Sequence, residues 1–378
     1  MTENPFVTNG YAGPDYFCDR VEETRTLVEL LTNGNNIALI SPRRLGKTDL
    51  IHHCFHQPAI KEHYYTFTID IYATDSLRDF VNVFGKTILE SLKPQGRKAW
   101  EGFLQVLSSI RSEISFDITG NPVWSIGIGS MTSPDITLNE IFNYLRNADK
   151  HCMVAIDEFQ QITRYHDNKN IEAALRTQIQ RCPNATFIFS GSQRHLMGEI
   201  FTSPSRPFYQ SVTIMNLHPI PLEHYWAFAE PQFAKGGNRH IQYEVVEAVY
   251  RRFHGITANI QKIMNLLYLK TQQGAVCTPD MVDKAIESYL QLSSDTYETL
   301  LKQMPEKQRN VFLAIAAEGV AKNISGGKFI HKYRLPSASS VVSAVKGLLE
   351  KDFITHERGE YYVYDQFFLL WVKKTILA

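Results

Sequence analysis

Apolar, β-branched and aromatic residues dominate four short runs in the first part of the chain. The runs cover residues 36–40, 64–72, 151–156 and 186–189, and such runs are typical of strands buried on both faces of a parallel sheet. Apolar residues spaced three and four apart predict helices over residues 21–31, 48–55, 77–92, 138–145 and 171–180. Residues 114–128 alternate around Gly120-Asn121-Pro122 and predict an inserted hairpin. This order predicts an α/β fold whose ligands bind at the carboxyl edge of the sheet.

The pattern changes near residue 222, where the strand signal ends. Four helical patterns follow, over residues 224–234, 243–253, 258–271 and 279–292. After residue 293 come a helix over 308–317, a second helix capped by Ser337 or a neighbour, and a hairpin of residues 353–355 and 361–364. Helix, helix and hairpin outline a winged helix. We therefore predict three domains, with residues 1–221 as the core, 222–292 as a helical domain and 293–378 as the winged-helix domain.

Composition narrows the class of protein. The 378 residues are 44% hydrophobic, which suffices for a buried core, and the formal net charge of zero predicts no whole-chain attraction to nucleic acid or anionic membranes. No run of about eighteen apolar residues and no secretory signal is visible, so we expect a cytoplasmic protein with no membrane partner. The five cysteines are scattered without a C-x-x-C pair, which predicts neither a zinc site nor a disulfide framework.

The first candidate site is the octapeptide Ser41-Pro42-Arg43-Arg44-Leu45-Gly46-Lys47-Thr48, directly after the run at 36–40. It matches the phosphate-binding pattern G-x-x-x-x-G-K-[ST] except that Ser41 replaces the first glycine. Lys47 would reach the β- and γ-phosphates, Thr48 would ligate Mg²⁺, and Gly46 would let the backbone approach phosphate. We expect nucleotide contacts from residues 41–48 and from Asp49 in the first turn of the following helix. The alternative is a surface turn.

The second candidate site is the acidic end of the run at 151–156. Asp157 would hold the metal through water, and Glu158 would orient or deprotonate the water that attacks the γ-phosphate. Alternatively the two carboxylates only cap the next helix. Asp70, near the end of the run at 64–72, competes for the metal role. Ser190 and Ser192 follow the last run and could sense the γ-phosphate, although serines there also form turns.

Arginines could stabilise negative charge in the transition state of phosphoryl transfer. The sequence offers five candidates and does not choose among them, because a solvated surface arginine is the default for each. They are Arg43, Arg44, Arg176, Arg194 and Arg206.

The order of these motifs resembles an AAA+ P-loop ATPase, more narrowly the prokaryotic family described as the ATPase domain predominant in archaea, placed with the signal-transduction ATPases. The resemblance rests on Tyr16-Phe17-Cys18-Asp19-Arg20, the octapeptide, Ile156-Asp157-Glu158-Phe159-Gln160, Ser190-Gly191-Ser192, Pro207-Phe208-Tyr209 and the aromatic segment at 362–371. It implies an AAA+ core with a parallel sheet, a helical lid and a C-terminal winged helix. It also implies that Phe17, Asp19 and Arg20 lie near an adenine base.

The chain departs from the family pattern at two places. Gln210 stands where relatives commonly have an arginine after Pro-x-Tyr, and the segment Gly255-Ile256-Thr257-Ala258 lacks a proline that many relatives place after glycine. The resemblance therefore implies no arginine at position 210. It also does not imply that the lid senses nucleotide.

Three functions remain open at this point. The first is a slow ATP hydrolase that uses ATP and Mg²⁺ as a conformational switch, read by a protein partner or by self-association. The second is a DNA-associated ATPase that binds duplex through Lys346 and Arg358 of the winged helix, where residues 322–374 carry nine Lys/Arg against five Asp/Glu. The third is a scaffold that binds nucleotide without hydrolysing it, against which the intact Asp157-Glu158 pair argues.

Overall fold

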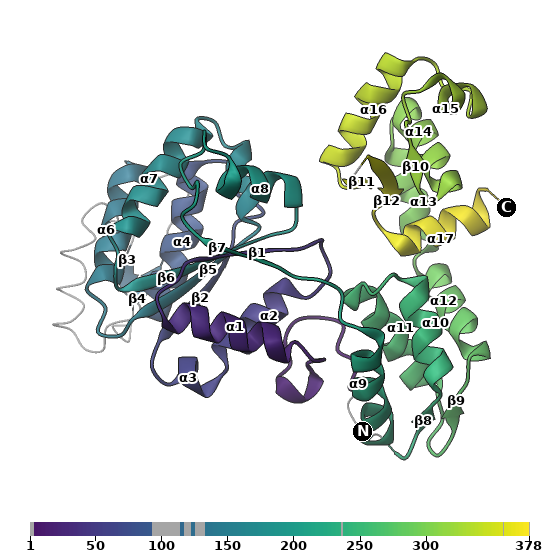
Figure 1. Ribbon diagram of the computed structural model, residues 1–378, viewed down its shortest axis with the longest axis horizontal. Coiled ribbons are helices and arrows are strands. Elements are labelled where there is room, and N and C mark those ends of the chain that lie inside the picture. Colours follow the sequence, from purple (N-terminus) through teal and green to yellow (C-terminus); the bar gives the residue numbers. More distant parts are fainter. Residues whose placement is uncertain are drawn as a thin grey trace. The chain divides into compact units, whose positions relative to one another are not determined.

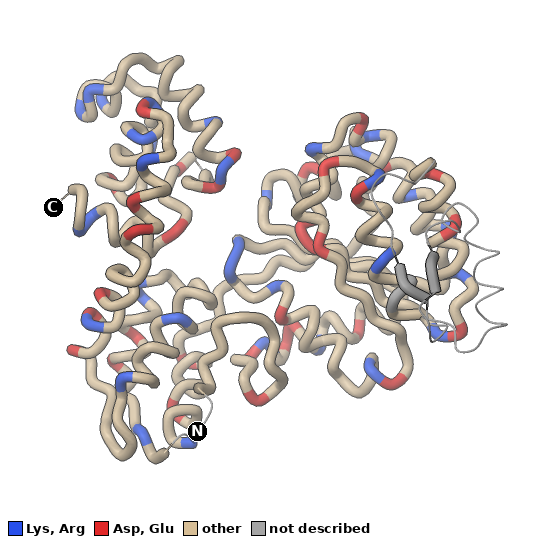
Figure 2. The backbone as a smooth tube through the Cα atoms, turned by 180° about the vertical axis from the view of Figure 1, so that it is seen from behind, with Lys and Arg blue, Asp and Glu red and all other residues tan. Residues whose placement is uncertain are grey.

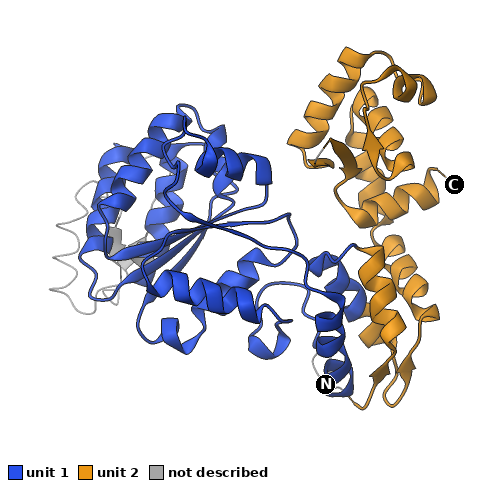
Figure 3. Ribbon diagram, viewed as in Figure 1, with its two compact units in different colours: residues 1–236, 254–265 blue, residues 237–253, 266–378 orange. Residues whose placement is uncertain are grey.

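The computed structural model describes residues 4–92, 114–116, 122–124, 133–235, 237–357 and 359–377. The chain forms two compact units (Figure 3). Unit 1 contains Met1–Gly236 and His254–Asn265, and unit 2 contains Gly237–Phe253 and Leu266–Ala378. The division into three domains at residues 221/222 and 292/293 stays a prediction.

A five-stranded parallel sheet forms the centre of unit 1 (Figure 1). Its strands are β1 (Ile37–Ile40), β2 (Tyr65–Asp70), β5 (Cys152–Asp157), β6 (Ala185–Gly191) and β7 (Thr213–Asn216), in the spatial order β2-β5-β6-β1-β7. All four pairings are parallel. The carboxyl ends of β1, β5 and β6 therefore lie at one edge of the sheet, where the two predicted motifs meet.

Helices cover both faces of this sheet (Figure 1). One face is covered by α1 (Val21–Thr32), α2 (Lys47–Phe55) and α3 (Pro58–Lys61), and the other by α4 (Leu77–Ser91), α6 (Pro134–Arg146), α7 (Asn168–Gln180) and α8 (Arg194–Thr202). Side chains alternate between the two cores, as the pleat requires. On β1, Ile37 and Leu39 pack with the α1–α3 helices, while Ala38 and Ile40 pack with the α4–α8 helices. Burial on both faces explains why β1 lacks polar positions.

The predicted strands and most predicted helices of unit 1 are confirmed, but β7, α3 and α8 were missed. β7 is an edge strand with largely exposed side chains, so it has no continuous apolar run to identify it. The predicted hairpin is confirmed where it is described, because β3 (Ile114–Phe116) pairs antiparallel with β4 (Pro122–Trp124). The rest of residues 114–128 lies outside the described residues.

The lid segment contains the four predicted helices: α9 (Leu222–Lys235), α10 (Tyr243–Arg252), α11 (Thr257–Lys270) and α12 (Asp280–Leu292). Helix α9 and the start of α11 belong to unit 1, and the remainder belongs to unit 2. The expectation that no strand occurs here was wrong. Residues His240–Ile241 (β8) and Val276–Cys277 (β9) form a parallel pair, too short for any periodic pattern to predict.

The last part of unit 2 is a winged helix. Its elements are α13 (Ser294–Gln303), α14 (Glu306–Glu318), β10 (Ala321–Lys322), α15 (Gly327–Lys332), α16 (Ala338–Glu350), β11 (Ile354–Glu357), β12 (Glu360–Val363) and α17 (Gln366–Thr375). The strands form an antiparallel sheet in the order β10-β12-β11. The predicted cap is confirmed, since the Ser337 hydroxyl accepts the Ser340 N–H at 3.2 Å. Arg358 lies outside the described residues.

None of the helices within the described ranges is both long and apolar enough to cross a membrane. Lys and Arg residues and Asp and Glu residues are both scattered over each unit (Figure 2). All five cysteines are buried.

Candidate functional site

The phosphate-type loop connects β1 to α2. Ser41 is fully buried; its N–H donates to the Gly191 carbonyl at 3.3 Å, and its hydroxyl donates to the Pro42 carbonyl at 2.8 Å. Positive φ angles occur at Arg44 (68°) and Gly46 (89°) but not at Ser41. A serine therefore fits the first position without backbone strain, because only the later positions need the left-handed conformation.

The start of α2 offers a place for an anion. Within the described ranges, no acceptor meets the backbone N–H groups of Gly46, Lys47 and Thr48. A Cβ built on Gly46 would meet nothing within 4 Å, so the space in front of the loop is open. Unpaired N–H groups and the helix dipole favour a phosphate at such a position.

Lys47 carries its charge into this partly closed site. The residue is only 6% exposed, and burial lowers the pKa of its ammonium group, although the carboxylates of Glu158 and Asp157 act in the opposite direction. A buried ammonium of this kind is stabilised when further negative charge arrives. The side chain is therefore suited to bind phosphate.

Asp157 joins three segments of unit 1. Its Oδ2 accepts the Thr48 hydroxyl at 2.6 Å, and its Oδ1 accepts the Ser190 hydroxyl at 2.5 Å and the Glu158 N–H at 2.9 Å. A hydroxyl and a carboxylate held together supply oxygen ligands that Mg²⁺ accepts. The predicted metal residues, Thr48 and Asp157, are thus in contact.

Asp70, the competing candidate, lies beside Asp157 on the neighbouring strand, because β2 and β5 pair these two residues. Its Oδ1 accepts the Tyr72 N–H at 2.8 Å. Burial is the main cause that raises the pKa of Asp70, and the charges of Asp157 and Glu158 add to it. Asp70 therefore shares the acidic edge but does not contact Thr48 directly.

Glu158 follows β5 in the left-handed conformation, with φ 55°. Its side chain caps no N–H of the 3-10 helix Phe159–Arg164. Its Oε2 instead accepts the Ser192 hydroxyl at 2.8 Å and the side-chain amide of Gln160. The carboxylate is thus held at the sheet edge rather than at a helix end.

Ser192 and Gln160 connect this carboxylate to the phosphate loop. The Ser192 hydroxyl accepts Arg43 Nε at 3.1 Å while it donates to Glu158. Gln160 is 3% exposed, and its Nε2 lies 3.5 Å from Ser192 Oγ. The sequence analysis assigned no role to Gln160, although this residue ends the motif at 156–160 on which the family resemblance rests.

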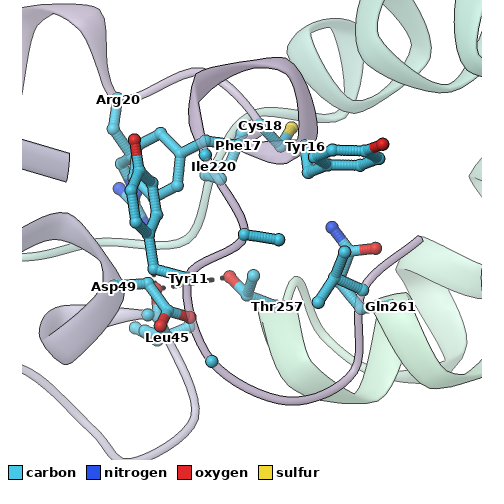
Figure 4. A pocket seen from close by; sticks show the side chains of 15 residues that line it. Tyr11, Tyr16, Phe17, Cys18, Arg20, Leu45, Asp49, Ile220, Thr257 and Gln261 are labelled. Carbon is cyan, nitrogen blue, oxygen red and sulfur yellow. Dashed lines mark hydrogen bonds between the residues drawn. The ribbon is translucent and has the colours of Figure 1, made fainter. Parts of the chain in front are cut away.

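A pocket lies next to the loop (Figure 4). Its lining includes five residues expected near nucleotide, which are Phe17, Arg20, Leu45, Gly46 and Asp49. Tyr11, Tyr16, Ile220, Thr257 and Gln261 also line it. Tyr11 and Phe17 lie on one side of it, and Tyr16 and Gln261 on the other. Asp19 is not part of the lining, since its carboxylate pairs with His224 Nδ1 at 2.7 Å.

Aromatic contacts fix one wall of this pocket. Phe17 stacks on His53 with ring centroids 4.2 Å apart, and Tyr11 packs edge-on against Phe17 at 5.7 Å. The Tyr11 hydroxyl also lies 2.9 Å from His53 Nδ1. The sequence did not single out Tyr11 or His53, because neither belongs to a local motif.

The pocket and the loop are directly connected. Arg20 Nη2 donates to the Leu45 carbonyl at 3.3 Å, and the Thr257 hydroxyl donates to the same carbonyl at 3.4 Å. The Ala258 N–H donates to the Arg44 carbonyl at 3.0 Å. The start of α11 therefore contacts the loop although the family's proline is missing.

Arg206, one of the five candidate arginines, has a different environment. It is 7% exposed and forms a buried ion pair with Glu172, with Glu199 at 3.5 Å. Burial raises the pKa of Glu172 to about 7, against the attraction of Arg206. Gln210, at the position where relatives have arginine, has φ 52° and donates its N–H to the Phe201 carbonyl at 3.1 Å.

A family model described as "ATPase domain predominantly from Archaea" matches residues 17–263 of this chain. The chain belongs to this ATPase family. A second model, described as "probable winged helix domain", matches residues 295–374 and agrees with the elements observed there.

Several solved structures share the fold of this chain over almost its full length. A Walker-type ATPase of Pyrococcus abyssi is 18% identical with a TM-score of 0.63, covering 98% of this chain and 99% of that one. The ORC1 protein of Aeropyrum pernix in complex with DNA is 11% identical (TM-score 0.53; 96% and 94% covered). The ADP form of the ORC2 protein of Aeropyrum pernix is 12% identical (TM-score 0.54; 96% and 93% covered). No curated protein sequence matches the chain.

Proposed function

We propose that this protein is a Mg²⁺-dependent ATP hydrolase whose bound nucleotide controls its conformation. The observation that carries the proposal is the contact between Thr48 and Asp157 at 2.6 Å, beside the buried ammonium of Lys47. It joins a phosphate-type loop to an acidic strand end, which is the arrangement that phosphoryl transfer from a nucleotide needs.

Each predicted residue has a place in this proposal. The N–H groups of Gly46 to Thr48 and the Lys47 ammonium would bind the phosphates, and residues 41–45 and Asp49 would shape the loop around them. Phe17 and Arg20 would contact the base in the adjacent pocket. Asp19, which lies between them in the sequence, would hold this segment in place from outside the pocket through its contact with His224. Adenine rather than guanine follows from the family alone.

Thr48 and Asp157 would hold the magnesium ion, either directly or through water. No group of three or more His, Cys, Asp or Glu side chains in the described ranges could hold a metal. The phosphates and water would therefore complete the coordination. The bound ion would supply positive charge that offsets charge developing on the phosphate oxygens.

Glu158 would act as the general base. Ser192 and Gln160 both donate to its Oε2, so its other oxygen can accept a proton from water. Ser190 would report on the site through Asp157, since its hydroxyl donates to that carboxylate. Both serines would therefore sense the γ-phosphate through the carboxylates that they contact, Asp157 for Ser190 and Glu158 for Ser192.

The switch would act through the start of α11. Thr257 and Ala258 donate to carbonyl groups of the phosphate loop, so a change in the loop is transmitted to this helix. A protein partner or self-association would respond to the change. We expect slow basal turnover, because a switch has to remain in one state for long enough to be recognised.

Hydrolysis of radiolabelled ATP by the purified chain, over a range of protein concentrations, tests the proposal. Lys47→Ala should abolish nucleotide binding, whereas Glu158→Gln should bind ATP and lose turnover by about 10²- to 10⁴-fold. Glu29→Gln is a matched control, because Glu29 is an exposed carboxylate on α1 with 63% side-chain exposure. Unchanged turnover in Glu158→Gln would remove the assigned base, and ATP binding with no turnover in the wild type would indicate a non-hydrolysing scaffold.

A second candidate function is DNA association through the winged helix. It is supported by the winged-helix match and by the exposed Lys346 of α16, whose side chain is 79% exposed. Addition of duplex DNA to the same assay, and retarded migration of duplex, would detect it. Binding should weaken steeply with salt and with Lys346→Ala or Arg358→Ala, but not with Lys302→Ala on α13, which is similarly exposed at 72%.

A further inference from the structure

Arg43 brings a guanidinium group to the carboxylate edge of the sheet. Its Nε donates to Ser192 Oγ at 3.1 Å, and the same hydroxyl donates to Glu158 Oε2 at 2.8 Å. One serine oxygen therefore separates Arg43 from the proposed base. No local motif predicts this, because Glu158 follows β5 and Ser192 follows β6.

Arg43 also lies near the ammonium group that would bind the phosphates. Its positive charge is among the causes that lower the pKa of Lys47, after burial. Its guanidinium lies 5.5 Å from the centre of the Tyr72 ring, which follows β2. Contacts to Ser192 and Tyr72 on two sides limit the directions in which this flexible side chain can point.

Two other arginines near the chain's motifs have fixed structural contacts. Arg206 is buried against Glu172, and Arg20 donates to the Leu45 carbonyl and to Glu23 at 2.6 Å. Gln210 supplies no charge at the position where relatives carry arginine. Arg43 is the candidate whose contacts place it between the phosphate loop and Glu158.

We propose that Arg43 stabilises the transition state of ATP hydrolysis from within the same chain. This inference rests on the hydrolysis proposed above. A water oxygen forms a bond to the γ-phosphorus while the bond from that phosphorus to the bridging oxygen breaks. The bridging oxygen keeps the electron pair and leaves with ADP, the water proton goes to Glu158, and inorganic phosphate results. Arg43 donates to the oxygens on which negative charge accumulates.

The role requires the planar fork of arginine. A lysine keeps the charge but presents a single point donor, so it cannot serve Ser192 and a phosphate oxygen in the same geometry. Arg43→Lys should therefore recover only part of the activity that Arg43→Ala loses.

Turnover, ATP binding and binding of ADP with aluminium fluoride, an analogue of the transferring phosphoryl group, test the proposal in the full-length chain. Arg43→Ala should lower kcat by about 10³-fold, bind ATP within a few-fold of the wild type, and lose the preference for ADP with aluminium fluoride over ADP. Ser192→Ala should retain that preference, since it changes the support of Glu158 and not the charge on the phosphate. Arg25→Ala controls for loss of an arginine, because the Arg25 side chain on α1 is exposed.

The outcomes separate this inference from the proposed function. A wild type without turnover would overturn the hydrolysis and this role with it. With an active wild type, normal kcat in Arg43→Ala would overturn the role of Arg43 alone. Equal losses of ATP binding and analogue binding in Arg43→Ala would show that Arg43 contacts the ground state instead. If Ser192→Ala lost the preference for the analogue as much as Arg43→Ala, the effect would be assigned to the network around Glu158.

Discussion

The Thr48 hydroxyl lies 2.6 Å from Oδ2 of Asp157, although 109 positions separate the two residues in the sequence. Thr48 lies in the first turn of α2 and Asp157 ends β5. Because β1 and β5 are parallel members of one sheet, their carboxyl ends lie at the same edge and bring the two oxygens together.

Thr48→Val should raise the Mg²⁺ concentration needed for half-maximal turnover by about tenfold or more, because it removes one of two candidate oxygen ligands. A titration of turnover with Mg²⁺ measures the change. Thr32→Val is the control, since the Thr32 hydroxyl donates only to carbonyls of its own helix. An unchanged Mg²⁺ requirement would show that Thr48 does not ligate the ion.

Lys47→Met should stabilise the nucleotide-free chain while it abolishes nucleotide binding. Burial lowers the pKa of Lys47 below its ordinary 10.5, so the folded state disfavours the charged form. This destabilising contribution is largest below the folded pKa and disappears as the pH rises to about 10.5. The melting temperature of Lys47→Met should therefore exceed that of the wild type near neutral pH, with a difference that shrinks in alkaline buffer. A lower melting temperature at every pH would contradict this.

Gly191→Ala should impair turnover by moving Gln160. A Cβ at Gly191 would lie 2.5 Å from Gln160 Oε1 and would also overlap Met197, so the buried amide that donates to Glu158 must shift. We expect kcat to fall while ATP affinity changes little, at a stability cost of about 1–3 kcal/mol. Gly198→Ala is the matched control, because a Cβ there meets nothing within 4 Å. Equal kcat in the two variants would remove Gln160 from the support of Glu158.

The sequence predicts the parts of this protein whose signals are local. The central strands β1 and β5 are buried on both faces and are visible as apolar runs. The octapeptide at 41–48 matches a phosphate-binding pattern at all of its defined positions except Ser41. The sequence analysis missed the edge strand β7, because its side chains are largely exposed and form no apolar run. The bond from Ser192 to Glu158 depends on the register between β5 and β6, which no single segment encodes.

The pocket beside the phosphate-type loop also combines residues with and without a local sequence signal. Phe17 and Arg20 were expected from the family resemblance and do line the pocket, whereas Asp19, between them in the same motif, points to His224. Tyr11 and Gln261 come from segments without a motif and join the pocket only through the fold. Sequence thus located the site but not the contacts that complete its walls.

The buried pair of Glu172 and Arg206 should support folding rather than catalysis. Both side chains are almost inaccessible, so Arg206→Met leaves Glu172 without its cation and should cost about 3 kcal/mol of unfolding free energy near pH 8. The double variant Arg206→Met with Glu172→Leu should regain much of that loss, because Glu172→Leu removes the unpaired carboxylate. Arg25→Met, which breaks an exposed pair with Glu22, should cost at most about 1 kcal/mol.

The pH dependence of this pair provides an independent check. The pKa of Glu172 is raised to about 7 in the folded chain from an ordinary 4.5, so the folded state binds the extra proton between these values. This contribution to stability is fully present below pH 4.5 and is lost as the pH rises through about 7. Glu172→Gln cannot titrate, so denaturant unfolding of this variant should depend less on pH across that window than unfolding of the wild type. Parallel pH profiles would show that Glu172 stays ionised throughout, with the attraction of Arg206 outweighing burial.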